Sequence, residues 1–225
     1  MESIAIVPAF NEENTIKEVI SRLRKVKITP IIVDDGSTDQ TYKLAKDFGV
    51  IVIRHKNNKG KGEALKTGFN FIMKNLPNVN YILIFDADMQ YKAEESEKIL
   101  QPLKENKADF VMGYRNWKEV PIANRLGNSI WRILFNYFFD VKMKDTNCGF
   151  IGLTRNVIKK IEKVHGGYII ENSMLRDAVK NNLRVKQVPV TVIYRKKRTL
   201  HFARMFFGIL IFIIVEGIKY KLSKI

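Results

Sequence analysis

Asp86 and Asp88 stand one residue apart, directly after the apolar run at residues 81–85. That run is short and rich in β-branched and aromatic residues, so it predicts a buried strand that ends at the two carboxylates. Neighbouring carboxylates cost desolvation and mutual repulsion unless a cation joins them, and hard divalent cations prefer such oxygen ligands. Because side chains alternate along an extended chain, a shared metal requires a bend here. The alternative interpretation is a strand-end turn whose aspartates are solvated.

The elements that must position this pair follow from the hydrophobic pattern. Apolar runs predict strands at residues 3–7, 30–33, 50–53, 81–85 and 109–112, with amphipathic helices between them. We expect Asn11 to cap the first helix and Ser37, with Gln40 three residues later, to cap the second. Strands and helices that alternate with short connections are typical of a doubly wound parallel sheet.

Acidic side chains follow two of the predicted strands. Asp34 and Asp35 come after the second strand, and Asp86 and Asp88 come after the fourth. Because doubly wound sheets bind ligands at the carboxyl ends of their strands, we expect these four side chains to border one cleft. Such a cleft favours a phosphorylated ligand held with a metal ion.

The loop at residues 56–62 reads Lys-Asn-Asn-Lys-Gly-Lys-Gly and opens a predicted helix. Its glycines permit close backbone approach, and the start of a helix offers free N–H groups to an anion. The loop does not match the pattern of a P-loop or of a dinucleotide-binding loop. A solvated turn is the alternative.

Charge and composition narrow the class of protein. The 225 residues carry a net charge of +16, which calls for an anionic partner such as nucleic acid, a phosphorylated substrate or a membrane surface. Nucleic acid is disfavoured, because no RNA-binding, zinc-finger or basic-zipper pattern is present and acidic residues occupy the predicted cleft. The single cysteine, Cys148, excludes an internal disulfide and fits a reducing compartment. Residues 1–10 lack the basic start of a signal peptide.

Several motifs in this order resemble inverting family 2 glycosyltransferases of the GT-A fold, and more narrowly the dolichyl-phosphate mannose and glucose synthases. They are Val-Pro-Ala-Phe-Asn-Glu at 7–12, Val-Asp-Asp-Gly-Ser-Thr-Asp at 33–39, Asp-Ala-Asp-Met-Gln at 86–90, Gly-Tyr-Arg at 113–115, Arg125 with Ser129, Lys-Asp-Thr-Asn-Cys-Gly-Phe at 144–150, and Val-Pro-Val-Thr at 188–191. The resemblance implies an α/β fold with a GT-A-type, doubly wound and mostly parallel sheet over residues 1–200. Residues 201–225 would form a tail.

The resemblance also implies a donor site for a nucleotide sugar, GDP-mannose or a UDP-sugar such as UDP-glucose. The residues implied to hold the nucleotide are Pro8, Ala9, Glu12 and Asp35, with Asp35 near the base or ribose. The residues implied to hold Mg²⁺ or Mn²⁺ against the donor diphosphate are Asp86, Asp88 and Gln90. Such a metal offsets the charge that grows on the leaving nucleotide, which also makes Asp88 catalytic.

An acceptor site is implied as well. Arg115, Arg125 and Ser129 would grip the phosphate of a polyprenyl phosphate, for which a guanidinium fork is well shaped. A phosphate monoester is already ionised at neutral pH and can attack the sugar without a strong base. Asp145 would orient an acceptor or sugar hydroxyl. A soluble or saccharide acceptor is the alternative, and it would need a carboxylate base, Asp145 or Glu171.

The sequence departs from the family at two places. Ser173 stands where family members often carry a second acidic residue after Glu171. The run at 195–201 is Arg-Lys-Lys-Arg-Thr-Leu-His in place of the common Arg followed by Ser-Lys. We expect Lys197, with Arg195 next, to meet the donor diphosphate.

The C-terminal segment 201–225 predicts an amphipathic helix on a membrane surface. Its apolar stretch at 205–215 is too short to span a hydrocarbon core of about 30 Å, and lysines follow it at 219, 221 and 224. Anionic lipid is the expected partner and the cytoplasmic face of a membrane the expected location, with peripheral attachment. The aromatic segment around Trp131 could face lipid too. The alternative for both segments is packing in the core or in an oligomer, whose size the sequence leaves open.

Overall fold

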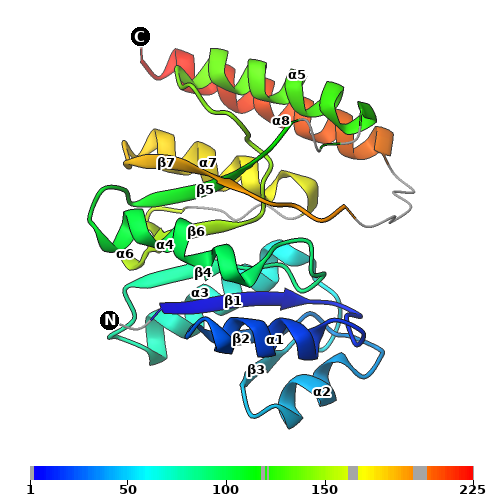
Figure 1. Ribbon diagram of the computed structural model, residues 1–225. Coiled ribbons are helices and arrows are strands. Elements are labelled where there is room, and N and C mark those ends of the chain that lie inside the picture. The colour runs from blue at the N-terminus through cyan, green and yellow to red at the C-terminus, as the bar shows by residue number, and fades with distance from the viewer. Residues whose placement is uncertain (1–2, 118–119, 121, 162–166, 195–201, 225) are drawn as a thin grey trace.

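The computed structural model describes residues 3–117, 120, 122–161, 167–194 and 202–224. A seven-stranded sheet forms its centre, in the order β3-β2-β1-β4-β6-β5-β7 (Figure 1). The strands are β1 (Ser3–Ala9), β2 (Thr29–Asp34), β3 (Ile51–Arg54), β4 (Tyr81–Ile84), β5 (Phe110–Arg115), β6 (Ile151–Thr154) and β7 (Val185–Val190). All seven residues of β1 are buried, as expected of a central strand covered on both faces.

The sheet is mostly parallel. β1 pairs in parallel with β2 and β4, β2 pairs in parallel with β3, and β5 pairs in parallel with β7. The exception is β6, which lies antiparallel between β4 and β5. The mixed, mostly parallel sheet with a C-terminal helix confirms the predicted fold class, although the hydrophobic pattern singled out neither β6 nor β7.

Helices cover both faces of the sheet. The helices of the described residues are α1 (Ile16–Lys25), α2 (Thr41–Asp47), α3 (Lys61–Asn75), α4 (Ser96–Lys104), α5 (Ile122–Phe139), α6 (Arg155–Ile158), α7 (Ile170–Lys180) and α8 (Phe202–Leu222), with single 3₁₀ turns at Ala93–Glu95 and Gly167–Ile169. A side chain added at Gly68 of α3 would meet Ile6 of β1, and one added at Gly152 of β6 would meet Ile99 of α4. The strand register places Ile6 in line with Ile151, the neighbour of Gly152. Because successive strand residues face opposite sides, α3 and α4 pack on opposite faces.

The predicted helix caps were wrong, because tertiary contacts use both side chains. Asn11 has a left-handed φ of 54°, and its side-chain oxygen accepts a hydrogen bond from the Thr38 backbone N–H. The Ser37 hydroxyl in turn accepts a hydrogen bond from the Asn11 N–H at 3.0 Å. The two residues therefore join the loops after β1 and β2 to each other.

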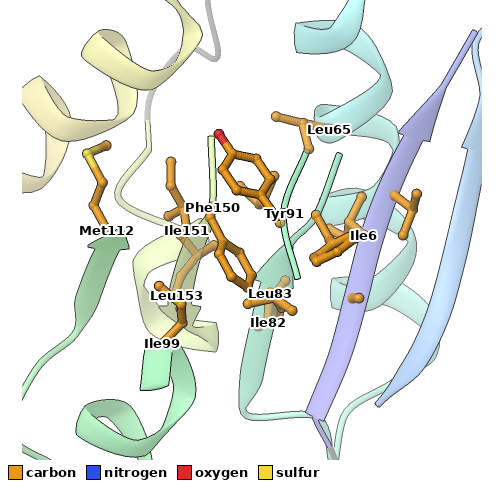
Figure 2. Packing of buried hydrophobic residues seen from close by; sticks show 14 of the residues in the cluster. Ile6, Leu65, Ile82, Leu83, Tyr91, Ile99, Met112, Phe150, Ile151 and Leu153 are labelled. Atoms are coloured by element: carbon orange, nitrogen blue, oxygen red, sulfur yellow. The ribbon is translucent and has the colours of Figure 1, made fainter. Parts of the chain in front are cut away.

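Three aromatic side chains anchor the turn that follows β4. Phe85 precedes the acidic turn, Tyr91 follows it, and both rings pack on Phe150, with ring centroids 5.4 and 5.1 Å apart. Figure 2 shows Tyr91 and Phe150 side by side in the core, close to Ile82 and Leu83 of β4. The Tyr91 hydroxyl accepts a hydrogen bond from the Gly149 N–H at 2.8 Å. Burial raises the pKa of this phenol well above its usual value, so the hydroxyl stays protonated.

The C-terminal segment forms a long helix that packs on the rest of the chain. Figure 1 shows α8 beside α5 at the end of the sheet that carries β7, and the two helices are in contact. Ile209 and Ile213 of α8 are buried. The Glu216 carboxylate forms a salt bridge with Arg176 on α7, with 2.8 Å between Oε2 of Glu216 and a terminal guanidinium nitrogen. No helix among the described residues is long and apolar enough to cross a membrane.

The aromatic segment of α5 is divided between core and surface. Trp131, Phe135 and Phe139 are buried, whereas Tyr137 is exposed. The Trp131 indole N–H donates a hydrogen bond to the Phe206 carbonyl of α8. Core packing, the alternative interpretation of this segment, therefore holds for its buried rings.

Candidate functional site

A cleft of about 360 Å³ lies at the carboxyl ends of β1, β2 and β4. Its lining residues are Pro8, Ala9, Phe10, Glu12, Asp35, Asn58, Gly60, Lys61, Ala64, Asp86, Ala87 and Asp88. We call it the first cavity. All four residues that the resemblance assigned to the nucleotide line it, together with two of the three assigned to the metal. Segments up to 80 residues apart in the sequence meet here because parallel strands end at one edge of the sheet.

A second cavity of about 490 Å³ adjoins the first, since both are lined by Lys61, Asp86 and Asp88. Its other lining residues are Gln90, Tyr91, Arg115, Asn147, Gly149, Gly167, Glu171, Val192, Tyr194 and Met205. The acidic turn therefore stands at the junction of two cavities. A group bound in one would meet a group bound in the other beside these carboxylates.

The bend predicted for the acidic pair is present. The chain leaves β4 in a turn at Ala87 and Asp88, and Met89 has a left-handed φ of 61°. The Asp88 carboxylate also accepts a hydrogen bond from the Gln90 N–H at 3.1 Å. Both aspartates consequently border the same space, which an extended chain would not allow.

Lys61, from the first turn of α3, bridges two carboxylates in the site. Its ammonium lies 2.7 Å from Asp86 and 3.0 Å from Glu171. Burial alone lowers the pKa of Lys61, but the charges of these two carboxylates outweigh it, so the pKa is raised and the group stays charged. The sequence analysis identified the loop that contains Lys61 as a possible anion site, but it did not predict the contacts of Lys61 with Asp86 and Glu171.

The acidic turn fits a hard divalent cation. Asp86, Asp88 and Gln90 supply carboxylate and amide oxygens to the second cavity. Among the described residues, no three His, Cys, Asp or Glu side chains gather closely enough to hold a metal alone. A cation here would need oxygens from a bound ligand to complete its shell, as Mg²⁺ does with substrate phosphates.

Asp35 is buried beside the loop that precedes α3. Its Oδ1 lies 2.6 Å from His55 Nδ1 and accepts the Lys59 N–H, and its Oδ2 accepts the Gly60 N–H at 2.7 Å. The backbone N–H groups of Lys59 and Gly60 are therefore taken by a protein carboxylate and are not free for an anion, whereas the side chains at 56–59 are exposed. The sequence around His55 did not indicate that this residue contacts Asp35, because the two residues are 20 positions apart.

Arg115 and Asp145 form a paired ion bridge at the edge of the second cavity. Nε of Arg115 lies 2.6 Å from Asp145 Oδ2, and a terminal nitrogen of Arg115 lies 2.8 Å from Oδ1. The Asp145 carboxylate also accepts the N–H groups of Arg115 and Asn147. Because these bonds occupy both oxygens, Asp145 orients Arg115. Of the two carboxylates considered as a base, Glu171 is the one that lines the second cavity.

Arg125 and Ser129 line a third, smaller cavity of about 240 Å³ together with Trp117 and Arg132. The four-residue spacing on α5 does bring Arg125 and Ser129 to one face. Arg115 lines the second cavity instead, but it stands only two residues before Trp117 in the chain. The three predicted acceptor residues are therefore split between two cavities. Arg195 and Lys197 lie outside the described residues, so their role stays a prediction.

The fold and the site define a class of protein: an α/β enzyme that binds its ligand across the carboxyl ends of a mostly parallel sheet. The chain belongs to glycosyl transferase family 2, whose sequence profile matches residues 4–165. The fold is of the GT-A type that the sequence motifs suggested.

Relatives are similar to this chain in sequence over most of its length, and a solved structure is similar in fold. An uncharacterized protein of Methanocaldococcus jannaschii is 32% identical over 85% of this chain and 88% of its own. The UDP-N-acetylglucosamine–dolichyl-phosphate N-acetylglucosaminyltransferase of Methanococcus voltae is 28% identical over 92% of each chain. The structure is similar to glucosyl-3-phosphoglycerate synthase from Mycobacterium tuberculosis in complex with Mn²⁺, UDP and phosphoglyceric acid, with a TM-score of 0.80, 19% identity, and coverage of 96% of this chain and 78% of that one.

Gly149 tests how tightly the charged cluster is packed. A Cβ at this position would lie 2.8 Å from an Asp86 oxygen, 3.2 Å from the Lys61 ammonium and 3.3 Å from Glu171. We expect Gly149→Ala to displace Asp86 and to lower the rate of glycosyl transfer about 10- to 100-fold, as misplacements of about 1 Å do. The measurement is the transfer rate of purified variants with matched melting temperatures. Gly208→Ala is the control, because nothing lies within 4 Å of a Cβ there; equal rates in both variants would contradict the packing argument.

Proposed function

We propose that this glycosyltransferase moves a hexose from a nucleotide sugar to a polyprenyl phosphate, with inversion and with a divalent metal ion. The observation that carries the proposal is the shared wall of the two cavities, formed by Lys61, Asp86 and Asp88. A nucleotide in the first cavity has its diphosphate at this wall, and the sugar then extends toward the second cavity. The Methanococcus voltae relative is named for transfer to dolichyl phosphate, which supports the acceptor class.

Different residues of the first cavity bind the nucleoside and the diphosphate of the donor. Pro8, Ala9, Glu12 and Asp35 bind the nucleoside, and the acidic turn lies at the diphosphate end. Glu12 is held in place by a hydrogen bond of 2.9 Å from the Thr15 hydroxyl. The carboxylates alone would repel a diphosphate, so the Lys61 ammonium and a cation are both needed at that end.

The metal is assigned to Asp86, Asp88 and Gln90. When bound, Mg²⁺ or Mn²⁺ offsets the negative charge on the departing nucleoside diphosphate. The similar mycobacterial structure was obtained with Mn²⁺ and UDP. The basic run that includes Arg195 and Lys197 is proposed to add positive charge at the same diphosphate.

The acceptor supplies its own nucleophile. A phosphate monoester oxygen forms a bond to the anomeric carbon while the bond from that carbon to the donor diphosphate breaks, which inverts the configuration. No protein base is required, because the second pKa of the monoester is about 6. Arg125 and Ser129 hold the phosphate in the cationic third cavity, and Arg115, fixed by Asp145, faces the reaction from the second.

We also propose that α5 and α8 attach the protein to the cytoplasmic face of a membrane that contains anionic lipid. The exposed side chains Phe207, Ile211, Val215, Ile218 and Leu222 recur at helical spacing along α8. Leu126, Ile133 and Tyr137 are exposed on the neighbouring α5. Lys219, Lys221 and Lys224 flank the apolar face, as is typical of helices that lie in the interface. The third cavity, on α5, then opens close to the lipid that carries the acceptor.

The transfer assay tests the function and the metal together. We expect labelled hexose to pass from a nucleotide sugar into the lipid phase when dolichyl phosphate and Mn²⁺ are present, and transfer to stop in excess chelator. Asp88→Asn should remove most turnover without unfolding, because it deletes ligand charge and no core packing. Full activity in excess chelator would contradict the proposed requirement for a metal ion. Label that enters only water-soluble product would show that the acceptor is a soluble molecule.

Arg125 tests the acceptor site. Loss of a guanidinium–phosphate contact costs about 2–3 kcal/mol, so we expect Arg125→Ala to raise the apparent KM for polyprenyl phosphate about 30- to 150-fold. Arg125→Lys should restore only part of the loss, since lysine keeps the charge but not the fork. The measurement is separate titration of donor and acceptor. Arg22→Ala, at a half-buried arginine of α1 that pairs with Glu18, is the control. A loss confined to donor affinity would show that Arg125 binds the nucleotide sugar and not the acceptor.

The membrane surface is tested by co-sedimentation with vesicles that contain phosphatidylserine. We expect Ile211→Glu, on the exposed face of α8, to reduce vesicle binding about tenfold or more, because it removes an aliphatic side chain that would enter the lipid and adds a charge of the same sign as the lipid. Ile51→Glu is the control: it makes the same change on β3, at the opposite end of the sheet (Figure 1). Equal binding of the two variants, or a wild-type chain that never co-sediments, would refute the assignment.

A further inference from the structure

The third cavity holds a second arginine, Arg132, to which the proposed acceptor site gives no role. Arg125, Ser129 and Arg132 follow one another on α5 at spacings of four and three residues, so they lie on one face of the helix. All three line the third cavity together with Trp117. This small cavity therefore carries two guanidinium groups, and of the described residues that line it none is a carboxylate.

The guanidinium of Arg132 has hydrogen-bonding capacity that the protein does not use. Its Nε is buried and has no hydrogen-bond partner among the described residues. The other two arginines differ in this respect. Nε of Arg125 donates to the Val120 carbonyl at 2.6 Å. Nε of Arg115 donates to the Asp145 carboxylate. Because a buried donor without an acceptor is costly, the Nε of Arg132 indicates a ligand that accepts from it.

Trp117 restrains the direction of this guanidinium. The central carbon of the Arg132 guanidinium lies 5.9 Å from the centre of the Trp117 ring, within the range of a cation–π contact. The indole N–H in turn donates a hydrogen bond to the Lys144 carbonyl at 3.2 Å. A guanidinium that stacks on a ring keeps its N–H edge for a second partner in the plane of the group. Trp117 is therefore a positioning residue for Arg132.

The position of the cavity decides which phosphates can reach it. Leu126 and Ile133, the chain neighbours of Arg125 and Arg132, are exposed on the surface that is proposed to lie against lipid. Phospholipid headgroups are phosphodiesters, and they reach the same depth as the acceptor phosphate in far larger amounts. A phosphate monoester carries about −1.5 to −2 charges at pH 7 and has three terminal oxygens. A phosphodiester has one charge and two terminal oxygens, so the two classes differ in what they offer to cationic donors.

Resting on the proposed function, we propose that Arg132 is a specificity-determining residue that selects a lipid phosphate monoester over phosphodiesters. Arg125 and Ser129 already supply donors to two terminal oxygens. The fork of Arg132 then needs a third terminal oxygen and a second negative charge, because each guanidinium pairs with its own share of the anion. A monoester supplies both and a diester supplies neither. The bulk lipid headgroups are thereby kept out of the acceptor site.

The test compares two lipids that differ by one methyl group. The whole protein is titrated calorimetrically with farnesyl phosphate, a short polyprenyl monoester, and with its methyl ester, a phosphodiester. We expect the wild-type protein to bind the monoester about tenfold more tightly or better. Arg132→Gln should weaken binding of the monoester about 10- to 100-fold, the range for a hydrogen bond to a charged group, and binding of the diester only a few-fold.

Two further variants and one competitor complete the experiment. Arg132→Lys keeps the charge but not the fork, so it should keep part of the preference for the monoester. Lys142→Gln is the control, because it removes one positive charge at an exposed residue shortly after the end of α5, and it should leave both affinities nearly unchanged. Short-chain phosphatidylglycerol, which presents a phospholipid headgroup, should fail to displace farnesyl phosphate from the wild-type protein.

The outcomes separate this inference from the proposed function. If folded Arg132→Gln weakens both lipids equally, or neither, Arg132 does not select the monoester and only this inference falls. Displacement of farnesyl phosphate from the wild-type protein by equal amounts of phosphatidylglycerol would overturn it too. A wild-type protein that binds neither farnesyl lipid would refute the polyprenyl phosphate acceptor itself. If Arg132→Gln has lost its melting transition, the wild-type preference and the phosphatidylglycerol competition decide the question.

Discussion

The aromatic packing of Phe85, Tyr91 and Phe150 is the constraint on which the site depends. Two carboxylates at the end of a strand repel each other and are stable in a solvated loop, not in a fixed turn. Here the residues before and after the turn are both held against one buried ring. Core packing, which is insensitive to charge, thereby supplies the order that electrostatics alone would oppose.

The charges inside the site are arranged as pairs that restrain one another. Lys61 is held by Asp86 and Glu171, and Arg115 is held by Asp145. Each pair joins segments remote in sequence, since Lys61 and Glu171 are 110 positions apart. The cations are therefore preorganised before any substrate arrives, and little reorganisation is needed when negative charge develops on a leaving group.

The sequence predicted most of what strand ends and periodicity determine, and missed what depends on distant contacts. The first five strands, the bend at Asp86 and the gathering of Pro8, Ala9, Glu12 and Asp35 around one cavity followed from local pattern and resemblance. The cap at Asn11 failed because its side chain bonds the loop after β2, a contact that no propensity encodes. His55 was missed for the same reason, and the antiparallel β6 was missed because its four residues carry no alternation of their own. Arg115 and Arg125 were predicted to bind one phosphate, yet they line different cavities, because Arg115 ends β5, where Asp145 holds it, and Arg125 lies on α5.

The ion pair between Glu216 and Arg176 bears on how this chain could be cut or recombined. Arg176 is buried, and its guanidinium is shared between Asp177 and the C-terminal helix. Loss of the last helix would remove Glu216 and leave the buried guanidinium with Asp177 alone, and it would also uncover the apolar surface that Ile209 and Ile213 bury. The last helix is therefore not a detachable module. A chimaera that replaced α8 would need a carboxylate at the position of Glu216. Residues added after α8 would leave this ion pair intact, whereas a truncation that removed α8 would break it.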